Sequence, residues 1–466
     1  MSKVLLISPF GKQVKEREDH PMGLLYIGSY LQKYNHTVNI CDMTLESEDV
    51  IAKIRSFQPD YVGIQVMTTE RFVVFDLCKK IKSISPDILI ILGGSHVLTT
   101  SREILENYYS YVDIIVRGYG EEPMAKIVDG IKLDDIHGIS YFDDNKRYHE
   151  NPINSNLDYD SLPIADYTLF NLNKYRLYVG DKLSLPLFTS LGCPFKCVFC
   201  AAGSMSQTVR FFQFHTIKKT IELIKELGFN AITIQDDTFG MNKEIAVKIM
   251  EKIKKMGMLC KIKTRLNLLD KDFLEFLKGH NCLGFHFGIE SASPKVRKII
   301  GKKINLDKAV EIAKISNRLK FDSYAFYMIG NPGENRNDAL LTISFSKKLR
   351  KLGIKDSYAT GVYVFPGTKL ERIARSEGVL PDNFNWTSPY QEQRNLLLDY
   401  SPFVPIYESM ELKIEDIYEL KCELLSSGLF YEKVRHNVAS LLSQKIRINV
   451  KRTWLFKYME IWILKK

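Results

Sequence analysis

Short apolar runs alternate with amphipathic stretches along the first 145 residues of the chain. Five of these runs are apolar on both faces, as strands buried in a parallel sheet are. They span residues 3–8, 37–41, 61–66, 87–94 and 112–118. This alternation predicts an α/β domain over residues 1–145, with a Rossmann-like, flavodoxin-like open sheet. In such sheets ligands bind at the carboxyl ends of the strands.

The periodicity is lost over residues 146–182, where Asn, Asp, Pro and Tyr accumulate, and this composition predicts an extended linker. Six further strand-like runs follow within residues 183–384. They span residues 185–190, 230–235, 259–264, 283–289, 323–329 and 356–365. Six β-α repeats predict a partial parallel (β/α)6 barrel with its active face at the carboxyl ends of the strands.

Two apolar stripes predict helices that pack against the barrel sheet. The first stripe is Ile217, Ile221, Ile224 and Leu227, and the second is Ile245, Ile249 and Ile253. We expect Thr216 to cap the start of the first helix and Gly228 to end it. These residues are expected to carry no chemistry.

Residues 385–466 are predicted to form a mainly helical carboxy-terminal region. Its last stretch, 445–466, mixes Lys and Arg with aromatic residues. Its apolar positions form no single helical stripe, so we expect it to dock on the barrel rather than lie on a membrane surface.

The length and composition of the chain limit the classes of protein to which it can belong. With 466 residues, 45% of them hydrophobic and 26% charged, the chain has the length of two or three globular domains. It contains no uncharged run of ~20 residues, and its first apolar run is too short for a signal peptide. We therefore expect a cytoplasmic protein. The net charge of +10 is spread over many helices without a basic stripe, so no nucleic-acid partner is expected.

Three of the eight cysteines, Cys193, Cys197 and Cys200, crowd into the segment "GCPFKCVFC". Thiols stay reduced in the cytosol, so such a cluster indicates metal binding or redox chemistry rather than disulfides. The other five are expected to be inert core residues. They are Cys41, Cys78, Cys260, Cys282 and Cys422.

Three thiolates directly after a barrel strand favour one kind of metal centre. A structural zinc site needs four ligands, usually in two separated pairs, and a thioredoxin-like C-x-x-C needs no third cysteine. Three thiolates suit a [4Fe-4S] cluster, because each binds one iron and one iron stays open for another ligand. Zinc remains the alternative metal.

The spacing C-x3-C-x2-C, with Phe199 before the last cysteine, resembles the signature of the radical S-adenosylmethionine (SAM) superfamily. The resemblance implies that Cys193, Cys197 and Cys200 hold a [4Fe-4S] cluster whose open iron binds SAM. It also implies that an electron from the cluster cleaves SAM to a 5'-deoxyadenosyl radical, which abstracts a hydrogen atom from the substrate.

Further positions at strand ends match the family and are expected to serve SAM. Asp236 and Asp237 would contact the cofactor or orient a neighbour, and Arg265 could pair with the SAM carboxylate. Glu290 and Ser291 would reach SAM polar groups. The turn formed by Gly330, Pro332, Gly333 and Glu334 would bring backbone to the adenine side.

The segments "PMGLLYIGSYLQ", "GGSH" and "RGYGEEP" resemble the cobalamin-binding domain of the B12-dependent radical SAM class, and the likeness covers residues 1 to about 380. It implies a cobalamin site at the edge where strands 3, 4 and 5 end. The residues expected there are Thr68, Thr69, Gly93, Gly94, Ser95, His96, Gly118, Gly120 and Glu121. Ser95 and Tyr119 depart from the family pattern, so a sheet that no longer binds cobalamin is the alternative.

One local pattern, Glu18-x-His20-x-x-Gly23, is close to a box that places a histidine on cobalt in other cobalamin proteins. His20 is therefore either a lower axial ligand or a loop histidine ahead of Pro21, as is usual in the radical SAM class.

The resemblance implies an enzyme that methylates an unactivated carbon, with a methyl group supplied by methylcobalamin. The alternatives are a B12-dependent cyclase or rearrangement enzyme, a radical SAM enzyme without bound cobalamin and, outside enzymology, an iron-sulfur and cobalamin sensor. We expect a small-molecule, peptide or lipid substrate, and a reductase, flavodoxin or ferredoxin as electron donor.

Overall fold

The computed structural model describes residues 1–9, 14, 16–45, 49–153, 162–202 and 208–425. By its internal contacts the chain divides into residues Met1–Ile417 and residues Tyr418–Lys466. The predicted terminal stretch 445–466 lies outside the described residues. No helix within the described ranges has both the length and the apolar character needed to cross a bilayer.

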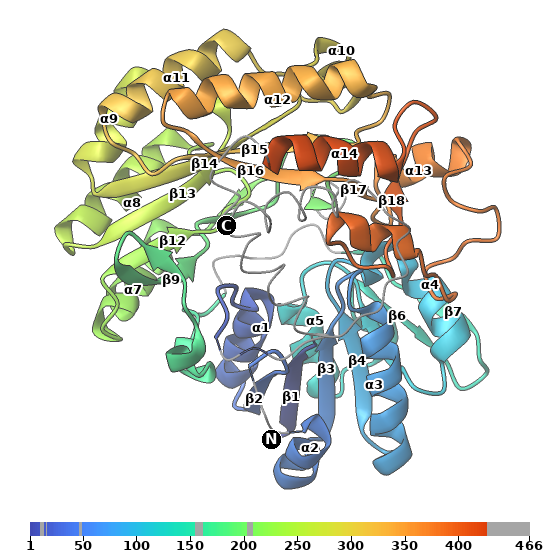
Figure 1. Cartoon of the computed structure of the whole chain (residues 1–466). Coiled ribbons are helices and arrows are strands. Elements are labelled where there is room, and N and C mark those ends of the chain that lie inside the picture. The colour runs from blue at the N-terminus through green and yellow to red at the C-terminus, as the bar shows by residue number, and fades with distance from the viewer. Residues whose placement is uncertain (10–13, 15, 46–48, 154–161, 203–207, 426–466) are drawn as a thin grey trace, which may run out of the picture. The chain divides into compact units, whose positions relative to one another are not determined.

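The amino-terminal sheet has seven strands in the order β2-β1-β3-β4-β5-β6-β7 (Figure 1). Its first five strands are parallel and confirm the predicted open sheet. They are β1 (Lys3–Ser8), β2 (Thr37–Asp42), β3 (Tyr61–Gln65), β4 (Leu89–Gly93) and β5 (Ile114–Val116). The sheet is buried on both faces, which explains why each strand reads as a continuous apolar run.

Five helices cover this sheet, and its two faces belong to different core clusters. Helices α1 (Met22–Lys33) and α5 (Glu121–Val128) pack on one face. Helices α2 (Val50–Phe57), α3 (Arg71–Ile84) and α4 (Val97–Tyr108) pack on the other. Each of these helices follows one of the five parallel strands in the chain. The predicted cobalamin residues lie at the carboxyl end of a strand, in the loop after it or at the start of the helix that follows it.

Two antiparallel strands at the sheet's edge were not expected from the sequence. Strands β6 (Ile139–Phe142) and β7 (Tyr148–Glu150) form a hairpin beside β5, so the sheet continues into the predicted linker. The turn is made by Asp143, whose carboxylate accepts the backbone N–H groups of Asn145 and Arg147. Such a polar turn between short strands resembles a linker in composition.

The second sheet has the order β16-β15-β14-β13-β12-β9-β8 and confirms the partial barrel (Figure 1). Its six parallel strands are β9 (Lys182–Leu187), β12 (Ala231–Ile234), β13 (Leu259–Thr264), β14 (Cys282–Glu290), β15 (Tyr324–Ile329) and β16 (Lys355–Thr360). Strand β8 (Tyr178–Val179) adds an antiparallel edge.

Helices follow the barrel strands and bury their apolar stripes against the sheet. They are α7 (Phe214–Glu226), α8 (Lys243–Lys255), α9 (Lys271–Gly279), α10 (Pro294–Ile299), α11 (Leu306–Arg318), α12 (Arg336–Lys351) and α13 (Lys369–Ser376). In α7, Ile217, Ile221 and Ile224 are fully buried, while Leu227 is only partly so.

The predicted cap of α7 was wrong. The helix starts at Phe214, and its N-cap residue Gln213 makes no side-chain cap, so Thr216 lies inside the first turn. The earlier start follows from the chain ahead of it, because the N–H of Phe212 donates to the carbonyl of Thr189. Gly228 has φ +89° just past the helix, as predicted for its end.

Two predicted barrel strands are shorter than expected. The run 185–190 splits into β9 and the separate strand β10 (Ser190–Leu191), which pairs with β11 (Arg210–Phe211). The run 356–365 breaks at Gly361, which has φ +105°, and β17 (Val362–Tyr363) leaves the sheet to pair with β18 (Ile406–Tyr407). In the described part of the carboxy-terminal region, α14 (Ile414–Leu425) follows β18.

Candidate functional site

The three clustered cysteines lie on the loop between β10 and β11, and each is partly exposed. All eight cysteines fall in the described part of the chain, and no disulfide joins any of them. Two backbone hydrogen bonds hold the middle of the loop. The N–H of Val198 donates to the carbonyl of Ile300, and the N–H of Leu370 donates to the carbonyl of Val198. The thiols are therefore carried by a loop that is fixed by the end of α10 and by the first turn of α13.

Asp236, at the end of β12, holds the chain just ahead of this loop. Its carboxylate accepts the backbone N–H groups of Thr189 at 2.6 Å and Ser190 at 3.1 Å, and also both hydroxyl groups. The side chain is buried. Asp236 therefore holds Thr189 and Ser190 in place, and its contact with the cofactor stays a prediction. Asp237 is exposed, beside Lys263.

Arg265 lies directly over the ring of Phe195, 3.6 Å from the guanidinium carbon to the ring centroid. Its Nη1 atom is 3.9 Å from the Sγ atom of Cys197, and its Nε atom is buried without a hydrogen-bond acceptor among the described residues. The stacking fixes the plane of the guanidinium next to the cysteine loop. A fixed guanidinium with an open N–H group can bind a carboxylate.

Glu290 ends β14 in the left-handed region, with φ +65°, and forms a buried ion pair with Lys302. The Nζ–Oε1 distance is 3.0 Å. Both groups lie over Gly288, where a Cβ atom would come within 2.0 Å of the Glu290 Oε1 atom. A side chain at position 288 would therefore displace the charged ends of this pair from their present positions.

Lys302 is a charged residue of this site that sequence reasoning missed. Its side chain is 6% exposed, whereas Lys303 beside it is exposed. In the sequence the two lysines look alike, within "IIGKKI". Only the fold, which turns Lys302 back towards β14, distinguishes them.

Ser291 is buried and turned into the protein. Its hydroxyl group pairs with Thr342 at 3.1 Å and accepts the N–H of Ser293, the residue that caps α10. The Ser291 hydroxyl group is therefore already hydrogen-bonded to protein groups, and its predicted contact with SAM stays a prediction.

Phe199 packs beside Val198 against the hydrophobic cluster that contains Met328 and Val364.

The turn after β15 is built around Glu334. Its carboxylate accepts the N–H groups of Gly330 at 2.7 Å and Asn331 at 2.9 Å, and burial raises its pKa to about 7. Gly330 and Gly333 have φ +95° and +68°, and Pro332 between them is buried. The backbone of this turn is therefore fixed, as a surface for a ligand must be.

In the amino-terminal sheet, the loops after β3 and β4 interlock. Gly94 has φ +104°, and a Cβ atom there would lie 2.8 Å from the carbonyl oxygen of Val66. The ring Nδ1 of the fully buried His96 pairs with the Thr68 hydroxyl at 3.1 Å. Ser95 reaches the sulfur of Met67. The structure thus brings four of the predicted cobalamin residues together, with two side chains bonded to one another.

The remaining predicted cobalamin residues lie on the same edge of the sheet. Gly93 ends β4 beside the end of β5, and the Thr69 hydroxyl donates to Glu70. Gly118 has φ +90° after β5. Gly120 lets α1 approach, because a Cβ atom there would meet Ile27 at 2.8 Å.

Glu121 begins α5 and is buried with one carboxylate oxygen, Oε2, lacking a hydrogen-bond partner among the described residues. Burial raises its pKa to about 7. The Nε2 atom of His96, at the same edge, likewise has no hydrogen-bond partner among the described residues.

Helix α1 connects the two sheets. Tyr26 packs its ring against Phe212 at 5.7 Å and Phe188 at 6.2 Å, which flank the strands on either side of the cysteine loop. Burial raises the pKa of Tyr26, and the charges of Asp236 and Glu121 raise it further. Tyr26 therefore lies within electrostatic reach of residues at the ends of both sheets.

His20 lies beneath two aromatic rings. Its imidazole stacks on Tyr175 with 4.0 Å between centroids, and Phe170 is 5.9 Å away. Burial lowers its pKa to about 4, so the ring is neutral near pH 7. A neutral ring is required of a metal ligand and is equally expected of a packed loop histidine. Both predicted alternatives for His20, a cobalt ligand and a packed loop histidine, therefore stay open.

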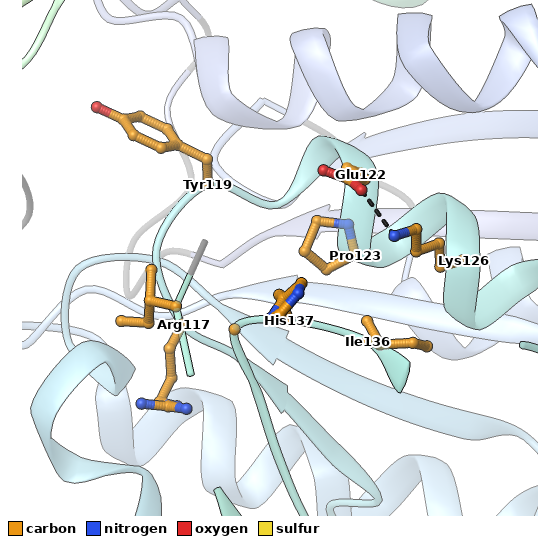
Figure 2. A pocket seen from close by; sticks show the side chains of 9 residues that line it. Arg117, Tyr119, Glu122, Pro123, Lys126, Ile136 and His137 are labelled. Carbon is orange, nitrogen blue, oxygen red and sulfur yellow. Dashed lines mark ion pairs between the residues drawn. The ribbon is translucent and has the colours of Figure 1, made fainter. Parts of the chain in front are cut away.

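A shallow pocket beside α5 is separate from the predicted residues (Figure 2). Tyr119, Pro123 and Ile136 line it, and Glu122 pairs with Lys126 at 2.7 Å on its rim. None of the predicted cobalamin residues lines it. Tyr119, which departs from the family pattern, lies at the edge of this pocket with its ring pointing away from Pro123 and Ile136 (Figure 2).

The three thiols are the right kind of ligand for an iron-sulfur cluster, although their side chains do not converge on one point in this structure. Within the described ranges, no three Cys, His, Asp or Glu side chains converge as a metal-ligand group. Three reduced, partly exposed thiols on one anchored loop, next to the guanidinium of Arg265, are nevertheless the donors that such a cluster uses. At the other sheet, the glycine-rich strand ends leave backbone accessible to a large flat ligand.

Comparison with known proteins matches two family models in the same order as the two sheets. Residues 16–128 match the B12 binding domain, and residues 187–346 match the radical SAM superfamily. An uncharacterized methyltransferase, PH0819 of Pyrococcus horikoshii, is 31% identical over 402 residues, covering 82% of this chain and 85% of that protein.

Two further proteins are similar over most of the chain. The cytidylyl-2-hydroxyethylphosphonate methyltransferase of Streptomyces wedmorensis is 24% identical, covering 71% of this chain and 73% of its own. The radical SAM methyltransferase TsrM of Kitasatospora setae, solved with cobalamin and a [4Fe-4S] cluster, has the same fold. Its TM-score is 0.72, at 15% identity over 90% of this chain and 91% of its own.

The order of the two domains and the extent of the likeness to PH0819 agree with the architecture described above. The chain belongs to the radical SAM superfamily, in the class of enzymes that carry an amino-terminal B12-binding domain.

Proposed function

We propose that this protein is a cobalamin-dependent radical SAM methyltransferase that acts on a carbon without an acidic proton. Cys193, Cys197 and Cys200 would hold a [4Fe-4S] cluster, and the edge formed by the loops after β3, β4 and β5 would hold cobalamin. When bound, the cluster supplies the electron that cleaves SAM, and the corrinoid supplies a methyl group to a carbon radical.

The observation that carries the proposal is the connection through α1. Tyr26 packs on Phe188 and Phe212 beside the cysteine loop and lies within electrostatic reach of Glu121 at the cobalamin edge. One rigid helix thus links the two predicted cofactor sites. A fixed spacing between them would be required, because the same substrate carbon must lie within reach of both cofactors, first to lose a hydrogen atom and then to receive the methyl group.

The residues around the cysteine loop would bind and orient SAM. Arg265, fixed by its stacking on Phe195, would bind the carboxylate. The buried pair Glu290–Lys302 would contact polar groups of SAM, and the turn around Glu334 would present its backbone to the adenine. Asp236 would serve the site indirectly, by holding Thr189 and Ser190.

Methylation is supported by the relatives named above, two of which are called methyltransferases by their curated names. The substrate would be a small molecule, a peptide or a lipid. The electron would come from a reductase or from a flavodoxin- or ferredoxin-type protein.

The test is anaerobic reconstitution with iron and sulfide, followed by SAM and a chemical reductant. We expect 5'-deoxyadenosine from the wild type and from Cys422→Ala, a control outside the cysteine loop, and none from Cys197→Ala. Equal release by all three proteins would overturn the assignment of the cluster. With methyl-deuterated SAM and an extract of small metabolites, a deuterated methyl group in a product supports methylation, and its absence favours rearrangement.

A further inference from the structure

Arg71, the first residue of α3, is a fully buried cation that is held by backbone carbonyl groups. Its side chain is 0% exposed and lies over the ring of Phe72, 4.1 Å from the centroid. Burial lowers its pKa to about 10, so the guanidinium keeps its charge at neutral pH. A buried charge of this kind costs free energy unless its N–H groups find acceptors.

The three acceptors come from three different segments of the chain. Nη1 donates to the carbonyl of Thr68 at 2.7 Å, Nε to that of Trp386 at 3.0 Å, and Nη2 to that of Phe403 at 2.6 Å. Thr68 belongs to the loop after β3, on the proposed cobalamin edge. Trp386 and Phe403 lie more than 300 residues further along the chain.

Trp386 fastens the same segment to α4 and to the barrel. Its backbone N–H donates to the Glu103 carboxylate at 2.7 Å, and its indole Nε1–H donates to Glu371 at 3.0 Å. The indole is 1% exposed and meets the edge of the His96 ring, with 5.8 Å between centroids. Burial, and then the charge of Arg71, lower the pKa of His96 to about 3, so this ring is neutral at pH 7.

A second contact joins the same two regions. Gly367, in the turn after β17, has φ +74°, and a Cβ atom there would come within 2.6 Å of the Thr99 methyl carbon of α4. Residues 365–404 therefore pack on the loops after β3 and β4 and on the helices that follow them. These residues lie beyond both family models, which end at 128 and 346.

We propose that residues 385–404 are part of the cobalamin site, and that Arg71 is a positioning residue that locks them to the loop after β3. The inference rests on the proposed function, because it assumes that this edge binds the corrinoid. Loss of Arg71 removes three charge-assisted hydrogen bonds at once, and it leaves the buried carbonyl groups of Thr68 and Trp386 and the partly buried one of Phe403 without their donor. Thr68 and the segment around Trp386 are then free to move apart.

The experiment measures how much hydroxocobalamin the reconstituted full-length protein retains after gel filtration, and how fast the corrinoid leaves it. Iron is counted in the same samples. The variants are Arg71→Met, which keeps the length of the side chain, and Arg71→Lys, which keeps the charge. Arg102→Met is the matched control, because Arg102 lies on α4 with a side chain that is 61% exposed.

We expect Arg71→Met to release corrinoid at least about tenfold faster than the wild type, with iron unchanged. Arg71→Lys should restore part of the retention, and Arg102→Met should match the wild type. If Arg71→Met fails to fold, Glu103→Ala replaces it. This variant removes the acceptor of the Trp386 N–H without leaving a buried cation, and it should release corrinoid about threefold faster.

Equal release by the wild type, Arg71→Met and Glu103→Ala would overturn this inference while leaving the proposed function intact. A loss of iron in parallel with corrinoid would also overturn it, because that pattern indicates general destabilisation. A wild-type protein that retains no corrinoid would overturn the proposed function itself, and this inference with it.

Discussion

The carboxylate of Asp236 accepts the backbone N–H of Thr189 at 2.6 Å, four residues ahead of the first cysteine of the predicted cluster motif. The backbone N–H and the hydroxyl group of Thr189, and the same two groups of Ser190, all donate to this one buried side chain. The turn into the cysteine loop is therefore set by a residue of the next barrel strand. This arrangement separates residues that hold the loop from residues that face a ligand.

Replacing Asp236 with alanine should impair cluster binding more than SAM contacts. It leaves four buried donors without an acceptor, at a cost of about 3 kcal/mol or more. We expect a lower thermal midpoint and severalfold less iron after reconstitution. Asp237→Asn is the matched control, because Asp237 is exposed and should affect SAM binding with iron retained. Equal iron contents in the two variants would contradict this separation of roles.

Gly93 and Gly94 should respond differently to alanine. At Gly94 a Cβ atom would lie 2.8 Å from the Val66 carbonyl oxygen, at φ +104°, whereas at Gly93 it would meet only the Val116 oxygen at 3.9 Å. Gly94→Ala should therefore cost about 2 kcal/mol of stability and displace the loop that carries His96. Gly93→Ala should be tolerated. Thermal unfolding of the two variants gives the comparison, and similar midpoints would refute it.

Arg265→Lys should weaken SAM binding. A lysine cannot stack on Phe195 or offer two parallel N–H groups, so we expect the Kd for SAM to rise about tenfold with iron unchanged. The control is Arg318→Lys on α11, where Arg318 forms an exposed ion pair with Glu275. Equilibrium binding to the reconstituted protein is the measurement. Wild-type affinity in Arg265→Lys would show that another cation, such as Lys302, binds the carboxylate.

Glu121 should make stability depend on pH. Its folded pKa of about 7 lies above the usual 4.5, so the folded state keeps a proton that the unfolded chain loses. Its contribution is complete below pH 4.5 and is lost as the pH rises through 7. Between pH 5 and pH 8, the free energy of unfolding of Glu121→Gln should therefore rise by about 2.5 kcal/mol relative to that of the wild type. The thermal midpoints of the two proteins at both pH values give this difference, and parallel behaviour would exclude it.

The sequence predicted both sheets, because strands buried on two faces leave continuous apolar runs between helical segments. It did not predict the hairpin of β6 and β7, whose polar turn at Asp143 resembles a linker. The apolar pattern also predicted one continuous strand where the structure has two, β16 and β17. The break between them lies at a single glycine, Gly361, which has φ +105°. Strand ends are decided by such tertiary contacts and not by apolar periodicity.

Residue identity suggested where site residues lie but not which way they point. Asp236, Ser291 and His96 all lie at predicted strand ends, yet each is bonded to protein groups in the structure. Conversely, Lys302 and Arg71 look like any other basic residues in the chain, and only burial distinguishes them. Long-range partners such as Trp386 cannot be inferred from spacing.

If the proposed function is correct, one chain holds an iron-sulfur cluster and a corrinoid at the same time. The most direct measurement is anaerobic reconstitution with iron, sulfide and hydroxocobalamin, followed by gel filtration and counting of iron and corrinoid per chain. We expect about four irons and about one corrinoid in the same fraction, with iron lost in Cys197→Ala. Iron without corrinoid would mean that the amino-terminal sheet is a scaffold, and would contradict the methylation proposal.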